Sequence, residues 1–378
     1  MHPLKTHAYR AIFLHDIFCI NLIMEEKMEQ KAENPTQRSS QISLADVNGF
    51  FERRVLKESG IELKALVSAG LDQLPMPGRG QTFVRWQILA AVAAQNLSLL
   101  KLYEGHTDAL AILDEIGDAT APPDSLWGTW CAEPPEARLN LYSAGAGTKV
   151  RLTGRKAWCS GAADVSHALV SCWNSTNEPC LAAVFLDQSG VSVTKDGWHA
   201  VGMADSGSVD VLFDNVIAQQ VGLPHAYLER RGFWYGGAGI AACWYGAAAA
   251  LAWKLHQQAQ NISASSSNDA HRLAHLGDVD IALSSAAAML RESARLIDLH
   301  PHVDAMLIAM RARLTVEAAA TSVYLATTRA LGAGPLCRDT HFAQMAADLP
   351  VFLRQSHAER DLALLGRKVT TESQPWRL

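Results

Sequence analysis

The C-terminal part of the chain carries four apolar-rich segments that are long enough to be members of a helical bundle. They cover residues 240–260, 271–299, 303–331 and 342–365. Helices of this length exceed the typical globular helix, and most of their stability in water comes from packing their apolar faces together. The serine-rich stretch 261–269 has the composition of a solvated loop. These segments predict a C-terminal four-helix bundle over residues 225–378.

The sequence before this bundle changes character once, near residue 125. Apolar residues recur at helical spacing over 44–67, and the stretch 83–104 is rich in alanine and leucine and has no glycine or proline. Between 127 and 221, short aliphatic runs alternate with Gly, Asp and Asn, which predicts about five to seven strands. We therefore expect an α+β chain with an N-terminal helical domain over 43–125, a middle β-sheet or barrel domain over 126–224, and the C-terminal bundle.

The first 42 residues lack this organisation. An apolar run over 11–24 follows two basic residues, as in a signal peptide, but Glu-rich sequence stands where a small-residue cleavage site would be. We interpret residues 1–42 as a disordered tail or a mis-assigned start, with Met24 or Met28 as better initiators. No apolar stretch reaches the roughly 18 uncharged residues that a membrane span needs. We therefore expect no spanning helix.

Charge and cysteine content narrow the classes of partner. The formal net charge is -5, and no stripe of Lys or Arg interleaved with aromatic residues occurs, which argues against nucleic acid as a partner. The seven cysteines form no CxxC pair and show no Cys/His spacing typical of zinc. We therefore expect reduced thiols, no metal site and a cytoplasmic protein.

Four motifs stand in the middle and C-terminal parts of the chain. They read Trp130-Cys131-Ala132-Glu133-Pro134, Gly154-Arg155-Lys156-Ala157-Trp158-Cys159-Ser160, the run from Gly202 to Val216, and Leu331-Gly332-Ala333-Gly334 followed by Ala347-Asp348. In this order they resemble motifs of the acyl-CoA dehydrogenase family. The second is the strongest match, to the family's Gly-x-Lys-x-Trp-Ile-Thr/Ser. The resemblance spans residues 44–368 and identifies a divergent member.

The first two motifs imply contacts with the ring of a bound FAD. In the family, the first motif holds the pyrimidine edge of the flavin, which implies this role for Trp130, Cys131 and Ala132. Here Ala132 replaces the family's threonine. The second motif implies that Trp158 packs on the isoalloxazine ring and that the Ser160 hydroxyl approaches N5.

The fourth motif implies contacts with the other half of FAD. Gly332 and Gly334 would let the backbone approach the pyrophosphate, and Arg329 replaces the family glutamine and would pair with phosphate. The family's Arg-x-x-Phe-Gly, which reaches the FAD of a neighbouring subunit, is replaced here by 261–269. Because long C-terminal helices pack between subunits in this architecture, we expect a homodimer or homotetramer.

The family reaction needs a carboxylate that removes the α proton of an acyl thioester while flavin N5 accepts the β hydride. Counting from Asp348 places Ser356, which has no carboxylate, at the usual position of this base. The branched-chain members place their glutamate before a Gly-Gly, a region where Glu229 stands; alternatively, Glu229 only begins a helix, where acidic residues are favoured. His357 is the other candidate, as a base or as a hydrogen-bond donor.

Three functions remain open from the sequence. The first is an FAD-dependent acyl-CoA dehydrogenase of fatty acid metabolism, with an acyl-CoA or acyl-carrier substrate and an electron-transfer partner. The second is a flavin-dependent monooxygenase of the same fold, which would use oxygen and would not need the glutamate. The third is a non-catalytic member that binds acyl groups or a partner subunit. We interpret two further polar residues, His106 and Asp108, as capping or pairing residues at a helix end.

Overall fold

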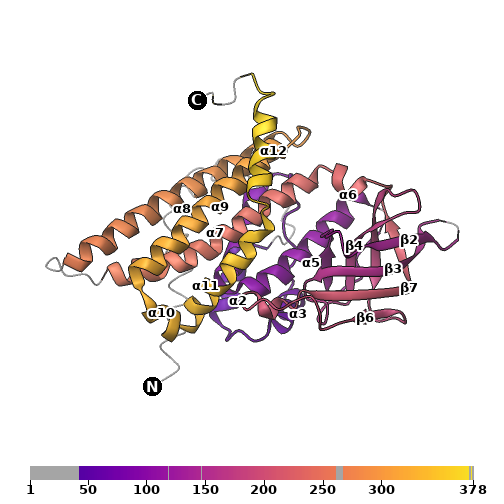
Figure 1. The fold of residues 1–378 in the computed structure, drawn as a ribbon, viewed down its shortest axis with the longest axis horizontal. Helices are drawn as coiled ribbons and strands as arrows, with labels where there is room; N and C mark the ends of the chain where they lie inside the picture. The colour runs from indigo at the N-terminus through magenta and orange to yellow at the C-terminus, as the bar shows by residue number, and fades with distance from the viewer. Residues whose placement is uncertain (1–41, 118, 146, 261–266, 374–375, 377–378) are drawn as a thin grey trace, which may run out of the picture.

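The computed structural model describes residues 42–117, 119–145, 147–260, 267–373 and 376 (Figure 1). Helices come first along the chain, a block of strands follows, and helices return. The mixed helical and β character expected from the sequence is therefore confirmed. The domain limits near residues 125 and 224 stay predictions, and the interpretation of residues 1–42 falls almost entirely outside the described residues.

The N-terminal helices are α2 (Leu44–Glu52), α3 (Ser59–Ser68), α4 (Thr82–Gln95) and α5 (Leu97–Ile116). The alanine- and leucine-rich run over 83–104 is not continuous, because Asn96 adopts an extended conformation between α4 and α5. The Asn96 side chain accepts a hydrogen bond from Leu99 N (2.8 Å) and thereby caps α5. Helix α5 then continues through Gly105 without a break to Ile116.

The middle of the chain forms a single sheet of seven strands: β1 (Trp127–Trp130), β2 (Leu139–Ser143), β3 (Lys149–Cys159), β4 (His167–Trp173), β5 (Pro179–Phe185), β6 (Val191–Val193) and β7 (Val209–Val221). The order is β1-β4-β2-β3-β7-β5, with β6 on β7 and a further pairing of β4 with β5. Because β5 also pairs with β4, the strands β4, β2, β3, β7 and β5 form a closed ring, which is a barrel.

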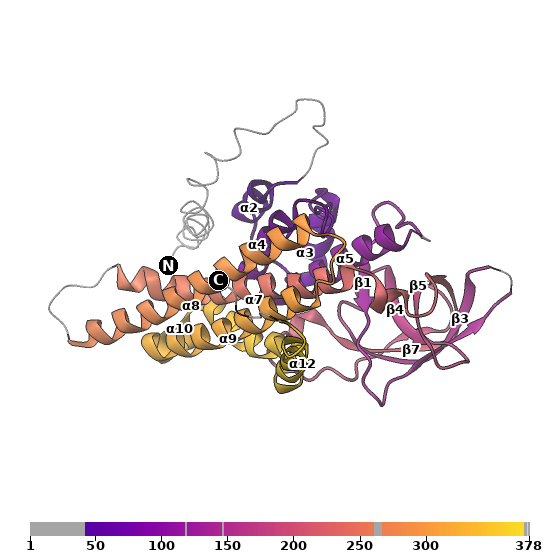
Figure 2. The same ribbon diagram turned by 90° about the horizontal axis from the view of Figure 1, so that it is seen from above.

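The C-terminal part contains α6 (Ala226–Glu229), α7 (Gly232–Ala259), α8 (Ser267–Leu299), α9 (Met306–Leu331), α10 (Ala333–Arg338), α11 (Thr340–Phe352) and α12 (Glu359–Val369). The long helices α7, α8 and α9 lie side by side (Figures 1 and 2). The segment 342–365, expected as one helix, is divided between α11 and α12. The break lies at Ser356, which is extended, and at Ala358, whose φ is 47°.

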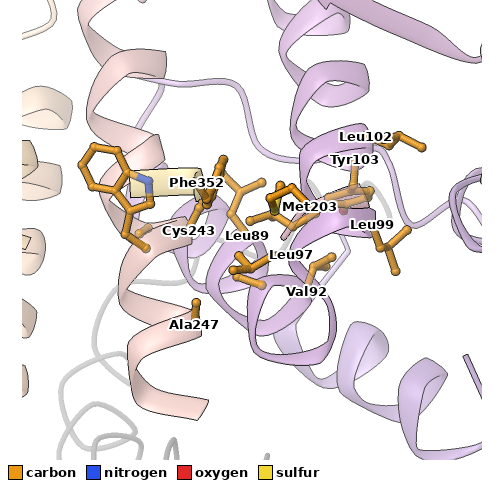
Figure 3. Packing of buried hydrophobic residues seen from close by; sticks show 14 of the residues in the cluster. Leu89, Val92, Leu97, Leu99, Leu102, Tyr103, Met203, Cys243, Ala247 and Phe352 are labelled. Carbon is orange, nitrogen blue, oxygen red and sulfur yellow. The ribbon is translucent and has the colours of Figure 1, made fainter. Parts of the chain in front are cut away.

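One continuous apolar core joins the three parts of the chain. Helix α4 packs against α7, and α5 packs against β1 and against the short 3₁₀ turn at Ala204–Ser206. Figure 3 shows this junction, where side chains from α4, α5, α7, α11 and the loop before the 3₁₀ turn meet. Its labelled members include Leu89, Leu102, Tyr103, Met203, Cys243 and Phe352.

A carboxylate fixes the barrel to the C-terminal helices. Met203 N, in the loop before β7, donates to Asp348 Oδ1 on α11 (2.5 Å), and Gln344 Nε2 donates to the same oxygen (2.8 Å). Burial raises the pKa of the Asp348 carboxyl. A Cβ at Gly202 would collide with the carbonyl oxygen of Ala347, so only glycine permits this approach. The third and fourth sequence motifs thus meet at one contact.

A buried ammonium group fixes the barrel internally. Lys156 on β3 is fully buried, and its Nζ donates to Glu133 Oε1 (2.6 Å), Ser171 Oγ (2.6 Å) and Ser171 O (2.9 Å). Its three N–H donors therefore all have acceptors. Glu133 also accepts from Trp173 Nε1 (2.9 Å). The pair joins β3 and β4 to the turn that follows β1.

Among the described residues, one helix is long and apolar enough by composition to cross a bilayer. It is α8, over Ala270–Leu299, with a mean hydropathy of 1.3 in its best 18-residue window. Helix α8 packs along α7 and α9 in the way of a bundle helix (Figure 2). Length and composition alone therefore do not identify a membrane span.

The substitution Glu133→Gln tests the internal anchor of the barrel. Lys156 is fully buried, so the substitution leaves a buried ammonium group without its anion, and we expect a loss of about 3–5 kcal/mol in the free energy of unfolding, measured by urea denaturation. The control is Glu136→Gln in the same connection, where the side chain is exposed and a change within about 0.5 kcal/mol is expected. Equal effects of the two substitutions would contradict the assignment.

Candidate functional site

Trp158 is presented by an irregularity in β3. Residues two apart in a regular strand point to the same face, yet Lys156 is fully buried whereas Trp158 is 50% exposed. The pairing of β3 with β7 shifts register between Lys156 and Cys159, and Trp158 has a φ of 57°. This bulge turns the indole outward. A tryptophan in the left-handed region costs about 1–2 kcal/mol, and such strain concentrates at functional sites.

Next to this tryptophan, a chain of hydroxyl groups runs from Ser160 into the protein. Ser160 Oγ lies 2.8 Å from Ser208 Oγ, which lies 2.9 Å from Ser206 Oγ, and Ser206 Oγ donates to Met203 O (2.7 Å). A carbonyl only accepts, so Ser206 donates to it, Ser208 donates to Ser206, and Ser160 donates to Ser208. The single proton of Ser160 is thereby used, and its oxygen presents lone pairs outward as an acceptor.

Charged residues line the face of α5 that points toward α7. Lys101, Glu104 and Asp108 share one face because they are three and seven residues apart. Lys101 Nζ bonds Glu104 Oε2 (2.8 Å), and the two side chains are 18% and 13% exposed. Burial acts to lower the pKa of Lys101, but the Glu104 carboxylate outweighs it and the pKa is raised. This face therefore carries a charged pair in an otherwise buried helix.

Small residues of α7 lie opposite this charged face. A Cβ built on Gly236 would lie 3.1 Å from Asp108 Oδ1, and one on Gly237 would meet nothing within 4 Å. Asp108 itself is 18% exposed and lies 3.8 Å from Arg85 Nη2. Asp108 and His106 both lie in the middle of α5, so their interpretation as capping residues at a helix end is wrong, whereas the alternative that they pair is confirmed for His106 with Asp72 and for Asp108 with Arg85. Helices α5 and α7 therefore approach each other closely at Gly236.

The predicted residues Trp130, Cys131 and Ala132 lie at and after the end of β1. Trp130 is buried and its Nε1 donates to Ser160 O (3.0 Å), so its ring supports the end of β3. Cys131 bonds Tyr227 of α6, and burial raises the pKa of its thiol to about 11. A neutral thiol is a poor nucleophile. The end of β1 and the end of β3 therefore lie together, and the contacts of these residues with a flavin stay predictions.

Solved structures with the same architecture include a putative dehydrogenase and two proteins with bound FMN. A putative acyl-CoA dehydrogenase from Mycobacterium smegmatis has a TM-score of 0.74 at 14% sequence identity, over 87% of this chain and 97% of its own. FMN-bound TdsC, a dibenzothiophene monooxygenase from Paenibacillus sp. A11-2, has a TM-score of 0.67 at 17% identity, over 95% and 96%. KijD3, in complex with FMN and a dTDP-linked amino sugar, has a TM-score of 0.70 at 17% identity, over 82% and 86%.

No protein-family model and no curated protein matches the sequence. The structural likeness decides the architecture. The chain has the acyl-CoA dehydrogenase fold. Identities below 20% do not carry the reaction of any of these proteins over to it, so the reaction has to be argued from its own residues.

The two candidate bases of this acyl-CoA dehydrogenase-fold protein are on its surface. Glu229 is exposed at the end of α6, and its side chain makes no hydrogen bond or ion pair within the described part of the chain. His357 is 56% exposed and lies 3.4 Å from Asp361 (Nδ1 to Oδ1). Their roles as catalytic residues stay predictions.

A carboxylate that the sequence did not single out lies beside the usual family position of the base. Ser356 Oγ donates to Glu317 Oε2 of α9, and Arg354 Nη2 donates to the other oxygen (2.6 Å). Glu317 is 9% exposed. Arg313, one turn earlier on α9, donates to Gly237 O (2.8 Å) and thereby links this group to the start of α7. Only the fold brings Glu317 to Ser356, since the two lie 39 positions apart in sequence.

The residues predicted to hold the pyrophosphate lie elsewhere. Arg329, Gly332 and Gly334 are exposed at the end of α9 and the start of α10. Helix α10 and the barrel lie at opposite ends of the molecule in both views (Figures 1 and 2). The predicted cofactor residues therefore form two groups, and one chain does not bring them together.

The bulge at Trp158 makes a prediction about stability. Trp158→Gly and Trp158→Ala both remove the indole, but only glycine relieves the left-handed backbone, so the glycine variant should be more stable by about 1 kcal/mol. The same two substitutions at Tyr142 provide the control, because that residue is 51% exposed in the ordinary strand β2 and alanine should be favoured there. Thermal and urea unfolding measure both differences, and the same sign at both positions would contradict the strain.

Proposed function

We propose that this chain is a flavin-dependent oxidoreductase that holds the flavin ring against Trp158 and Ser160. The support is the outward indole of Trp158 on a strained bulge, next to a hydroxyl whose orientation is fixed by neighbouring serines. An exposed aromatic ring suits stacking on a planar ligand. When bound, the flavin would supply hydride or electron transfer and, in its reduced form, reaction with oxygen.

We propose FMN as the cofactor that one chain is able to hold by itself. The residues for the ring and those for the pyrophosphate lie at opposite ends of the molecule (Figure 1). FAD, expected from the resemblance, would need the α9–α10 group of a second copy, in a homodimer or homotetramer. FMN lacks the adenine half and needs only the barrel group. FMN is also the flavin named in the structures of TdsC and KijD3.

The hydroxyl chain favours the reduced form of the flavin. The resemblance implies that Ser160 approaches N5, which accepts a hydrogen bond in the oxidised flavin and donates one from N–H in the reduced flavin. Ser160 donates its proton to Ser208 and is left as an acceptor. Such a site is suited to take up reduced flavin made elsewhere. We therefore propose that the reaction is a monooxygenation, in which oxygen and a separate flavin reductase are partners.

The charged face of α5 supports a polar substrate. An acyl chain needs apolar walls, whereas Lys101 and Glu104 place two charges on this face. We propose that these two residues bind and orient a substrate that carries polar groups and that they take no other part in the reaction. In a monooxygenation one oxygen atom would enter that substrate and the other would leave as water, with both electrons supplied by the reductase.

Acyl-CoA dehydrogenation remains the second candidate, because one observation favours it. The Glu317 carboxylate lies at the side chain of Ser356, the position where the family's base is expected. It would have to move away from Ser356 and Arg354 to reach a substrate. Because both partners hold it, we rank this function below the monooxygenation.

The preference for reduced flavin is testable by binding. Wild-type protein should bind reduced FMN more tightly than oxidised FMN in anaerobic titrations. Ser208→Ala removes the acceptor of the Ser160 proton, so Ser160 becomes free to donate outward, and the ratio of the two affinities should fall about fivefold, which corresponds to a net hydrogen bond of about 1 kcal/mol. Arg329→Ala, at the other end of the molecule, should leave the ratio unchanged. An unaltered ratio in Ser208→Ala would remove this support for the monooxygenase.

The choice between the two reactions is testable by spectroscopy. Protein loaded with oxidised FMN or FAD should keep its flavin absorbance when a panel of acyl-CoA thioesters is added anaerobically, and reduced FMN supplied by a reductase should be reoxidised by oxygen on the protein. Bleaching by one acyl-CoA that disappears in Glu317→Gln would instead establish the dehydrogenase. Failure to bind either flavin would establish the non-catalytic alternative.

A further inference from the structure

A cavity of about 440 Å³ lies on the side of α5 that faces away from α7. Its walls come from the connection between α3 and α4, from the second half of α5 and from the linker 119–125 before β1. In the described part of the chain, neither Trp158 nor Ser160 lines it. Small-molecule sites occupy about 300–1,000 Å³, so the cavity has the size of a ligand site separate from the one proposed above.

Asp72 places a carboxylate in the wall of this cavity, with 6% of its surface exposed. Its Oδ2 accepts hydrogen bonds from Gln73 Nε2 (2.8 Å) and from His106 Nε2 (3.2 Å). Its Oδ1 accepts none from any residue that the structure describes, and among those residues no Lys or Arg nitrogen lies within 4.0 Å of it. One oxygen of a buried carboxylate is therefore left for another donor.

The histidine beside Asp72 is electrically neutral. Trp127 N donates to His106 Nδ1 (3.1 Å). A ring nitrogen that accepts a hydrogen bond carries no proton, so the ring proton is on Nε2, which donates to Asp72. Both protein partners of Asp72 are thus neutral donors. A buried carboxylate without an opposite charge is unfavourable, and a cationic ligand would remove that penalty.

Two of the other charged groups at the cavity already have partners, and the third, Asp124, is exposed to solvent. Arg85 Nη2 donates to Thr107 O (3.0 Å) and lies 3.8 Å from Asp108, and Asp114 is paired with Arg79 (2.6 Å). Arg85 therefore does not compensate Asp72, and Asp114 does not compete with it for a cation. The rest of the lining is largely apolar, with Val67, Leu74, Met76, Leu110 and Leu113.

We propose that this cavity binds an organic ammonium ion with a compact apolar body. The ammonium group would donate to Asp72 Oδ1, and the apolar body would lie against the aliphatic side chains of α5 and the α3–α4 connection. The site also contacts the barrel, because His106 Nδ1 accepts a hydrogen bond from the backbone N–H of Trp127, the first residue of β1. The proposal does not rest on the proposed oxidoreductase function.

Calorimetric titration of the full-length protein with phenethylammonium chloride tests the site. Wild type should bind it, and 2-phenylethanol, which has the same body without the charge, should bind at least tenfold more weakly. Asp72→Asn should weaken binding of the ammonium at least tenfold. In this variant the asparagine oxygen keeps both bonds from Gln73 and His106, while its amide group replaces the free carboxylate oxygen.

Two further variants keep the test decisive if Asp72→Asn folds poorly. Leu110→Trp fills the cavity from α5 and should abolish binding without touching Asp72. Asp114→Asn removes a carboxylate that also lines the cavity but is 41% exposed and paired, and it should leave the affinity unchanged. Equal binding of the alcohol and the ammonium, absence of ammonium binding, or an equal loss in Asp114→Asn would overturn the proposal.

Discussion

The pair of Lys156 and Glu133 is the interaction on which the proposed flavin site depends. A fully buried ammonium group is tolerated only where all its protons and its charge are matched, and Glu133 and Ser171 meet this condition. The pair holds the turn after β1 against β3. Because Lys156 must point inward, the bulge two residues later is what frees Trp158 to point outward. The first two of the four motifs that carry the family resemblance are therefore joined by one buried ion pair.

A second buried charged group, the Asp348 carboxylate, joins the barrel to the C-terminal helices through hydrogen bonds. Met203 donates its N–H to Asp348 of α11 and accepts, at its carbonyl, the hydroxyl of Ser206. The residue that docks the barrel on the C-terminal helices thus also ends the hydroxyl chain that begins at Ser160. Any shift of α11 relative to the barrel would disturb the oxygen of Met203 and, through it, the orientation of the Ser160 hydroxyl. The position of the helices and the chemistry offered to a flavin are linked through one peptide group.

Sequence reasoning recovered what depends on local pattern. The strands between residues 127 and 221 and the Gly-x-Lys-x-Trp motif were predictable, because alternation and short motifs are properties of neighbouring residues. The break at Asn96 was predictable only in part, since a polar residue within an apolar run competes weakly with helix. Glu317 could not be found, because its partner Ser356 comes from a distant helix. The outward turn of Trp158 also could not be found, because it follows from the pairing of β3 with β7 and from the burial of Lys156.

Helix α5 shows why its polar residues were hard to interpret from sequence. Residues 101, 104 and 108 face α7, whereas residues 106, 110, 113 and 114 face the opposite way. Between residues 97 and 113 no residue of α5 is exposed, so each polar residue in this part has to be paired or left available to a ligand. His106 meets this demand through β1 and Asp72, and Lys101 meets it through Glu104. Asp72, in the connection between α3 and α4, has no hydrogen-bond donor for its Oδ1 within the described chain. This unpaired oxygen is the strongest argument for a ligand on this side of α5.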